Sequence, residues 1–446
     1  MRENKFLLPL IFGMFSATQI RVVGSIGISE LVCYIVAPFI LIKDASILRR
    51  DGFMPVIWLS IFAMIGCCLS SLHNNTAIPL FLRGLAVTYS LFALPICMHR
   101  MLRGNLSALK WILLGLCISG IINIFWFRQA TALGMAAEGL SDVEMTQRII
   151  SGPLFWLQRV GGWLALPVTG WYLQTPTWYA LVAPLIMVVN TIVTTDSGRS
   201  AMMSSLVSFI IIFWGGKKIC TMKKMQNHIY KLIFTSFVVG AGFLLLYKAL
   251  AATGHLNEMA TNKYEAQTKM GGGALNLLMA GRSEVFIGLF AALDNPIWGW
   301  GPWALDEKGF SEDFLSKYGS ADDYQQYLIM KKEAMAMGLS ANLLPSHSHI
   351  IGFWMNYGLL ALPFWFYIVI CILRHFRYNI TSVPQWFGYF ALSLPVFVWH
   401  IMFSPYGGRV SDCLIITCML LADAIRRRKL ELPYDMVQEI YAKGIA

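Results

Sequence analysis

The chain has 446 residues, of which 57% are hydrophobic and 13% are charged, and its formal net charge is +11. A soluble domain carries roughly 45–50% apolar and about 25% charged residues, so this chain has too few charges to cover a water-soluble globule of its size. An ordinary soluble enzyme is therefore excluded. The positive balance fits either nucleic-acid binding or the basic cytoplasmic loops of a membrane protein, and the positions of the charges decide between them.

Apolar runs long enough for transmembrane helices, about 20 residues each, recur along the chain. We expect about twelve spans, near residues 6–20, 22–42, 53–72, 77–97, 106–127, 154–173, 178–193, 201–214, 232–251, 350–373, 386–403 and 410–425. The first run is not interpreted as a signal peptide, because no small-x-small cleavage site follows it and the next span begins at once. The predicted fold class is an all-α integral membrane protein.

The spans divide the chain into three parts. Residues 1–251 hold the first nine spans, residues 252–347 form one large polar loop, and residues 348–446 hold the last three spans and a tail. The loop contains two predicted helices, Ser283–Leu293 and Asp322–Met337, because apolar residues recur there at helical spacing. We expect these helices to lie on the membrane surface and to cover a cavity between the spans.

Basic residues fall at alternate connections between the predicted spans. The basic groups on one side are Lys43, Arg49, Arg50, Arg100, Arg103, Lys217, Lys218, Lys223, Lys224, Arg374, Arg377 and the cluster 426–429. This positive-inside pattern assigns them to the cytoplasm together with both termini, and it explains most of the net charge without nucleic acid. The interval 128–152 and the large loop then lie on the outer face.

Two arginines and a histidine are expected to meet at that outer face. Arg199 lies at the outer end of the eighth span, Arg282 begins a loop helix, and His347 precedes the tenth span. Guanidinium groups bind phosphate oxygens in a bidentate fork, and Gly198 and Gly281 would let the backbone approach such a ligand closely. His347 could act as a general base near neutral pH. The alternative is that both arginines only reach toward lipid headgroups.

Charged and titratable groups also occur within the apolar runs. They are Glu30, Arg83, Arg159 and His400. A charge at mid-membrane costs a few kcal/mol, so each should face the protein interior or a wet cavity. Arg83 and Arg159 could line a polar cavity for a phosphorylated lipid. The alternative is a structural ion pair, for example between Glu30 and an arginine.

The sequence gives little support for a metal or another cofactor, and none is expected. His347 and His349 would need carboxylate partners such as Asp322 and Asp323 to hold a metal ion. The nine cysteines include no CxxC pair, so they predict neither a zinc site nor a disulfide framework.

Three segments resemble motifs of the O-antigen ligase and O-antigen polymerase superfamily. In that family a histidine followed by Asn or Ser precedes an apolar span, with a glycine about eleven residues on, as in residues 346–360. Residues 281–282 followed by 295–301 resemble its outer-loop motif, and residues 197–200 (Ser-Gly-Arg-Ser) resemble its Ser-Arg-Gly motif with the order altered. The resemblance covers roughly residues 180–375.

The resemblance implies a metal-independent, inverting glycosyltransferase of the GT-C type. The family acts at the periplasmic face of the bacterial inner membrane on an oligosaccharide linked to undecaprenyl diphosphate. By this resemblance Arg199 and Arg282 would bind the diphosphate, and His347 would deprotonate the acceptor hydroxyl. The chain departs from the motif in carrying a second histidine, His349. Either histidine could be the base, and the other could bind substrate.

Two related activities fit this family. The sequence favours a polymerase of O-antigen or other surface-polysaccharide repeat units, because the His-Ser form of the motif and the aromatic clusters at 353–354 and 364–366 resemble polymerases more than ligases. The alternative is an O-antigen ligase of lipopolysaccharide biosynthesis, which would transfer the glycan to lipid A core. A polysaccharide-lipid flippase or a non-catalytic assembly protein is a weaker interpretation. The expected partners are the lipid-linked oligosaccharide, an acceptor glycan lipid or lipid A core, the membrane and a chain-length regulator.

Overall fold

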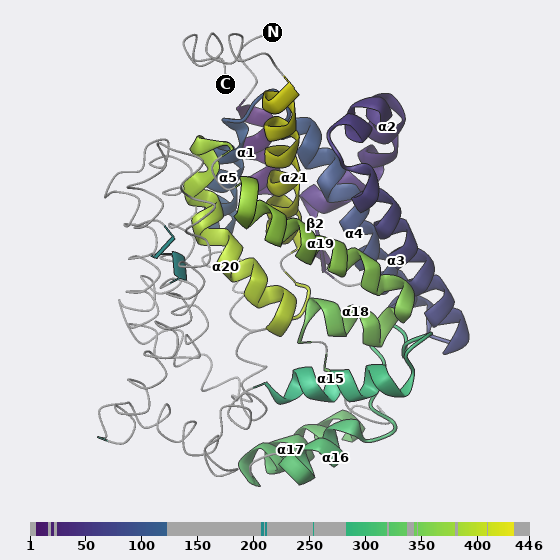
Figure 1. Cartoon of the computed structure of the whole chain (residues 1–446). Coiled ribbons are helices and arrows are strands. Elements are labelled where there is room, and N and C mark those ends of the chain that lie inside the picture. Colours follow the sequence, from purple (N-terminus) through teal and green to yellow (C-terminus); the bar gives the residue numbers. More distant parts are fainter. Residues whose placement is uncertain are drawn as a thin grey trace.

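The computed structural model describes residues 6–16, 19–21, 25–122, 207–208, 210–211, 253, 282–318, 321–336, 343–345, 347–379, 382–407 and 409–431. This part of the chain is mostly helical and includes a short β-hairpin (Figure 1). Four of its helices are long and apolar enough to cross a membrane. The fold is therefore that of a helical membrane protein. The spans predicted between residues 123 and 251 lie outside the described residues, apart from a few positions.

The N-terminal region differs from the sequence-based prediction. Helix α1 (Leu7–Met14) has eight residues, and an antiparallel hairpin of β1 (Gln19–Arg21) and β2 (Ser25–Gly27) separates it from α2 (Ile28–Arg50). Eight residues span about 12 Å, less than half of a bilayer core of about 30 Å. The first predicted span is thus wrong, because the apolar run continues through a turn and a strand rather than through one helix. The second span begins at residue 28 instead of 22.

Helix α1 instead packs closely against α5 (Ala108–Ile122). A Cβ added to Gly13 would lie 2.9 Å from the Cα of Gly115, so the two backbones are in direct contact. Small residues permit such close approach between helices. The hydroxyl of Ser29, at the start of α2, donates to the carbonyl of Phe12 at 2.6 Å and connects α2 to α1.

The third, fourth and eleventh predicted spans are confirmed as helices. They are α3 (Met54–His73), α4 (Ile78–Leu102) and α20 (Phe387–Phe403). The last predicted span corresponds to α21 (Arg409–Glu431), which packs against α4 in the centre of the bundle (Figure 1). The core between them is formed by fully buried apolar side chains, among them Leu94, Met98 and Cys418.

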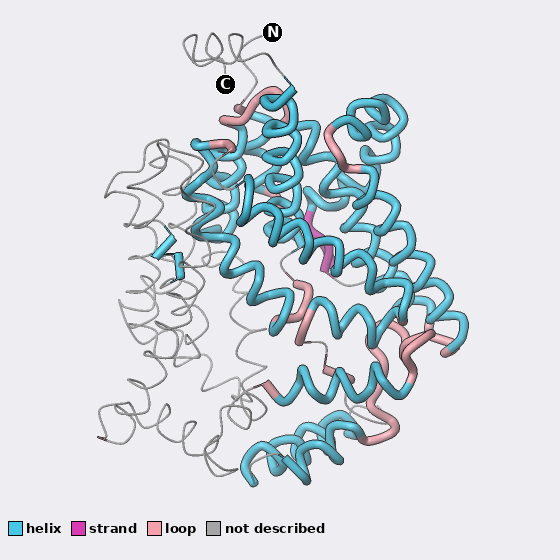
Figure 2. Tube along the Cα trace, in the orientation of Figure 1, coloured by secondary structure: helices cyan, strands magenta, loops and turns pink. Residues whose placement is uncertain are grey.

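Three helices of the large polar loop lie together beyond one end of the bundle. They are α15 (Ser283–Asp294), α16 (Phe310–Tyr318) and α17 (Ala321–Ala336), and Figure 2 shows the turns and loops that join this layer to the bundle. The first and third confirm the two helices predicted for the loop. Helix α16 was not predicted, because its nine residues offer only a short apolar pattern. It packs on α15 through the nearly parallel rings of Phe286 and Phe314.

The tenth predicted span is also wrong as a single helix. Helix α18 (His349–Tyr357) ends at Gly358, whose φ is +73°, and the chain continues through the 3-10 turn η3 (Leu359–Ala361) into α19 (Leu362–Arg374). The large loop occupies this break, because the amide of Trp300 donates to the carbonyl of Met355 at 2.7 Å. The amide of Leu359 donates in turn to the carbonyl of Ile297 at 3.1 Å. The span-capable segment begins only after the break, at Leu359.

The break gives a clear stability prediction. We expect Gly358→Ala to destabilise the protein by about 2–4 kcal/mol, because a Cβ there would overlap the carbonyl of Ile297 in a left-handed backbone. Gly104→Ala is the matched control, since Gly104 has a similar φ of +75° but no atom within 4 Å of the added Cβ. Thermal unfolding in detergent should separate the two variants. Equal losses would show that backbone strain, and not the docked loop, makes glycine necessary.

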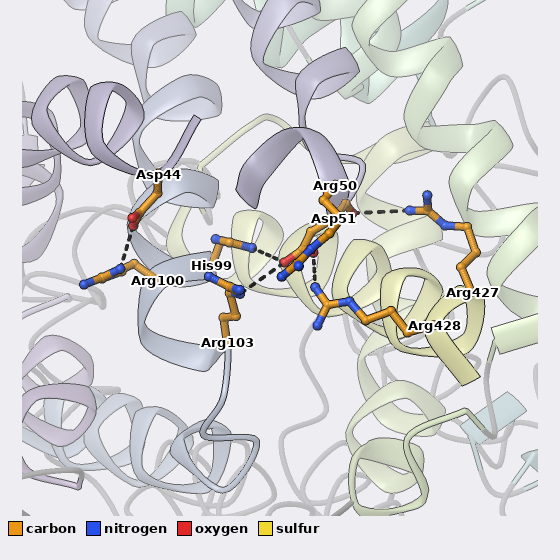
Figure 3. A network of polar contacts seen from close by, with 8 residues as sticks. All are labelled: Asp44, Arg50, Asp51, His99, Arg100, Arg103, Arg427 and Arg428. Carbon is orange, nitrogen blue, oxygen red and sulfur yellow. Dashed lines mark hydrogen bonds and ion pairs between the residues drawn. The ribbon is translucent and has the colours of Figure 1, made fainter. Parts of the chain in front are cut away.

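A buried carboxylate organises the other end of the bundle, as Figure 3 shows. Asp51, in the turn between α2 and α3, has no exposed side-chain surface and accepts from His99 at 2.9 Å and from Arg428. Arg103 lies 3.4 Å from the same carboxylate, and Arg427 donates to the Asp51 carbonyl at 3.4 Å. The network therefore joins the α2–α3 turn to the C-terminal ends of α4 and α21.

The network sets the protonation of Asp51. Burial alone would raise the pKa of this carboxyl group, but hydrogen bonds from His99 and Arg428 outweigh it and hold the pKa below the ordinary value of 3.8. A carboxyl group whose pKa falls on folding stabilises the folded state above its unfolded pKa and loses that contribution as the pH falls further. The network thus contributes fully at any pH above about 4.

The basic network and the loop helices occupy opposite ends of the molecule. Helix α3 starts beside Asp51 and is followed by Asn74, whose side-chain amide donates to the carbonyl of Gly299 in the large loop at 3.0 Å. Since α3 has 20 residues, the two ends lie about 30 Å apart, which matches the thickness of a bilayer core.

Candidate functional site

A cavity of about 610 Å³ lies between the loop helices and the bundle. Helices α15, α16 and α17 contribute to one side, and α4, α18 and residues 405–407 contribute to the other. The polar and aromatic residues among those that line it are Ser283, Glu284, Trp303, Ser311, Tyr327, His347, Ser348, Phe353, Asn356, Tyr357 and Tyr406. Its volume lies within the range of small-molecule sites, about 300–1,000 Å³. This mixture of polar and aromatic side chains suits a ligand with both polar edges and apolar faces.

His347 lines this cavity directly before α18. The next residue, Ser348, is the N-cap of that helix, and its hydroxyl accepts from the Ile351 amide at 3.2 Å and donates to the Ile401 carbonyl at 2.9 Å. The cap therefore fixes the backbone beside His347. The Nδ1 atom of His347 is buried and has no hydrogen-bond partner within the described part of the chain. A buried polar atom without a partner is costly, and a ligand hydroxyl in the cavity would supply one.

His349 faces away from the cavity and is fully buried. Its Nδ1 lies 2.9 Å from the carbonyl oxygen of Ser404, and its Nε2 lies 3.1 Å from Oδ2 of Asp412. Both ring nitrogens are therefore already engaged by groups of the protein, and His349 is not among the residues that line the cavity. The predicted substrate-binding role of His349 stays a prediction, and this cavity does not include the residue. His347 and His349 lie on either side of Ser348, the N-cap of α18. Of the two histidines, only His347 lines the cavity.

Asp412 also contacts a second histidine. Its Oδ1 lies 3.2 Å from Nδ1 of His400, so the carboxylate lies between an α18 histidine and an α20 histidine. The possible ligand atoms of His349, His400 and Asp412 lie within 4.8 Å of one another, and these are residue types that bind transition metals. Each carboxylate oxygen is, however, already occupied by one ring. We interpret the cluster as charge-assisted hydrogen bonds that join α18, α20 and α21.

Arg282 lies at the edge of the cavity as the N-cap residue of α15. The two residues after it, Ser283 and Glu284, line the cavity. Its guanidinium carbon lies 4.8 Å from the ring centroid of Trp399 and 5.9 Å from that of Phe403, both on α20. These cation–π contacts hold the charge against α20 and connect α15 to the bundle.

Arg83 and Glu30 have different environments. Glu30 forms an ion pair with Arg409 at 3.0 Å, which confirms the structural alternative for this residue. Arg83 has a buried Nε that has no hydrogen-bond partner among the residues described. It precedes the cavity-lining Val87 by four residues on α4, so the two share one face of that helix. Arg83 thus lies one turn from the cavity on its α4 side.

The remaining predicted site residues cannot be placed. Gly198, Arg199, Arg159 and Gly281 lie outside the described residues. Of the predicted site residues that can be placed, His347 lines the cavity, Arg282 directly precedes two lining residues, and Arg83 lies one helical turn from a lining residue. It adds Glu284 and Trp303 to the lining, which the sequence analysis did not single out as site residues.

The fold and the cavity define a helical membrane protein with a ligand-sized site at one end. No protein-family model matches the chain, and a search of curated proteins gives no significant match. The argument for function therefore depends on the motifs of the sequence and on the geometry of the cavity.

Proposed function

We propose that this protein is a bacterial inner-membrane glycosyltransferase that polymerises undecaprenyl-diphosphate-linked repeat units of a surface polysaccharide. One observation carries the proposal. His347, the histidine of the segment that resembles the polymerase and ligase motif, lines a ligand-sized cavity, and its Nδ1 has no hydrogen-bond partner among the described residues. Arg282 directly precedes two residues that line the same cavity. A base and a fixed cation at one cavity suit the transfer of a group from a diphosphate.

In the proposed reaction, a hydroxyl of the acceptor glycan attacks the anomeric carbon of the donor sugar. The bond between that carbon and the diphosphate oxygen breaks, His347 takes the hydroxyl proton, and undecaprenyl diphosphate leaves. Arg282, with Arg199, would bind the negative charge that develops on the leaving group. Attack from the opposite face inverts the anomeric configuration. No metal ion is needed, because the arginines neutralise the diphosphate.

The proposed orientation places the cavity at the periplasmic face. The arginine-rich network around Asp51 lies at the end of α3 that is remote from the cavity, and basic residues favour the cytoplasmic side. The complete arrangement would be a GT-C-like bundle of about twelve spans with both termini in the cytoplasm.

The test is reconstitution of the purified protein in proteoliposomes with an undecaprenyl-diphosphate-linked repeat unit. Reactions run with and without lipid A core, and with and without EDTA. Longer chains on the carrier alone would support a polymerase, whereas product formed only with lipid A core would indicate a ligase. No glycan product in any reaction of the wild-type protein would refute the enzyme proposal and favour a transporter.

Arg282→Ala should lower the transfer rate in this assay by about 10²–10³-fold, the usual effect of removing one group that stabilises a developing negative charge. Arg282→Lys should restore part of the rate, since it keeps the charge but loses the bidentate fork. Arg377→Ala is the matched control, because its guanidinium lies 4.9 Å from the Tyr378 ring but on a segment that does not line the cavity. Equal rates for Arg282→Ala and Arg377→Ala would remove Arg282 from the reaction.

A further inference from the structure

Trp303 has an unusual backbone conformation. Its φ is +55°, and the only other non-glycine residue with positive φ in the described part of the chain is Asn75. Asn75 lies in the turn between α3 and α4, and asparagine tolerates the left-handed region. A bulky tryptophan does not, so its presence there indicates a constraint imposed by the surrounding structure.

The chain on both sides of Trp303 supplies that constraint. Before it, the amide of Gly301 donates to the carbonyl of Asn356 at 3.0 Å, on the C-terminal turn of α18. After it, the carbonyl of Ala304 accepts from the amide of Leu344 at 2.9 Å. Two docked segments therefore fix the backbone around Trp303. A glycine at this position would satisfy the same φ without strain, so the indole itself requires an explanation.

The half-buried indole belongs to the lining of the cavity, and it shares that lining with Glu284, Asn356 and His347. An indole offers a large apolar face, whereas a carboxylate and an amide offer hydrogen bonds. A pyranose ring has matching properties, because its axial C–H groups form an apolar face and its hydroxyls surround the edge. An isoprenoid chain has no group to satisfy a carboxylate, so burying Glu284 against it would be unfavourable.

We propose that Trp303 is the platform on which a sugar ring of the glycan stacks, with Glu284 accepting hydrogen bonds from the hydroxyls of that sugar. This inference rests on the proposed function and specifies which part of the substrate the cavity receives. The cavity holds the saccharide and not the lipid tail. Trp303 then contributes to saccharide specificity and affinity, and the strained backbone is retained because it positions the indole beside His347.

The test uses native mass spectrometry of the full-length protein in detergent. The probes are undecaprenyl diphosphate and the same carrier bearing the repeat unit, isolated from membranes of the organism that makes this chain. Trp303→Gly should lose about tenfold or more in affinity for the sugar-bearing carrier, and its affinity for the bare carrier should be unchanged. Trp303→Phe should lose less, and Glu284→Gln should also lose affinity only for the sugar-bearing carrier.

The glycine variant separates binding from folding. Trp303→Gly should melt at the same temperature as the wild type or higher, because glycine relieves the positive φ. Trp300→Phe is the control, since the Trp300 indole donates to the Ala291 carbonyl at 2.7 Å and should affect thermal stability but not the preference for sugar.

Two results would overturn the inference. Equal loss of affinity for both carriers in Trp303→Gly would mean that the indole packs on the lipid, and no loss for either would mean that Trp303 is structural only. A wild-type protein that binds neither carrier would instead refute the proposed function, and the sugar platform with it.

Discussion

His347→Ala is expected to reduce glycan transfer by about 10²–10⁴-fold, the usual contribution of a general base. The acceptor hydroxyl would then have no group to take its proton, whereas the arginines that bind the diphosphate would remain. Binding of the lipid-linked donor should therefore change little. Initial rates of chain growth at saturating donor, together with native mass spectrometry of the bound carrier, measure the two quantities separately.

The control for His347 is a histidine at the same end of the molecule. His73 stacks on Trp298 with ring centroids 5.4 Å apart and does not line the cavity, so His73→Ala should keep most of the activity. Added imidazole should restore part of the rate of His347→Ala, because a free base can enter the space left by the side chain. A normal rate in His347→Ala would exclude this residue as the base.

Asp412→Ala is expected to destabilise the protein by about 3–5 kcal/mol, the usual result of removing one partner from a buried charged pair. His349 has no exposed surface, and its Nε2 would lose its acceptor while Nδ1 remained bonded to Ser404. His400 would lose the same carboxylate. Chemical denaturation in detergent, followed by circular dichroism, measures the difference.

A double-mutant cycle tests the reason for that loss. If Asp412 is needed mainly because of His349, then His349→Leu combined with Asp412→Leu should cost less than the sum of the single variants, since the double variant no longer leaves Nε2 of His349 without its acceptor. The double variant should also bind donor normally, because neither side chain lines the cavity. Strictly additive losses would show that the two residues act independently.

The sequence predicted the parts of the fold that depend on local patterns. Helices α3 and α4 were predicted from apolar runs of about 20 residues, and α15 and α17 were predicted from apolar residues at helical spacing. A hydropathy window failed at α1 and at Gly358, where the apolar run continues but the backbone changes direction. Whether an apolar run forms one helix depends on tertiary contacts, such as the docking of the large loop onto α18.

In the candidate site too, local sequence patterns identify some residues, and others are identified only by tertiary contacts. His347 and Arg282 could be selected from motifs in the sequence, and in the structure His347 lines the cavity while Arg282 directly precedes two lining residues. The different surroundings of His347 and His349 could not be predicted, because the hydrogen-bond partners of the His349 ring lie 55 and 63 residues away along the chain. Trp303 could not be recognised either, because a positive φ at a tryptophan leaves no mark on the sequence.

The network around Asp51 has a consequence for how the protein is made. Asp51 is synthesised 377 residues before Arg428, which binds its carboxylate, although His99 follows it after only 48 residues. During insertion the early helices can therefore assemble around a partly satisfied carboxylate, and the arginine arrives only with the last described helix. A chain that stops before α21 would leave this end incomplete, which gives membrane quality control a means to distinguish finished from truncated copies.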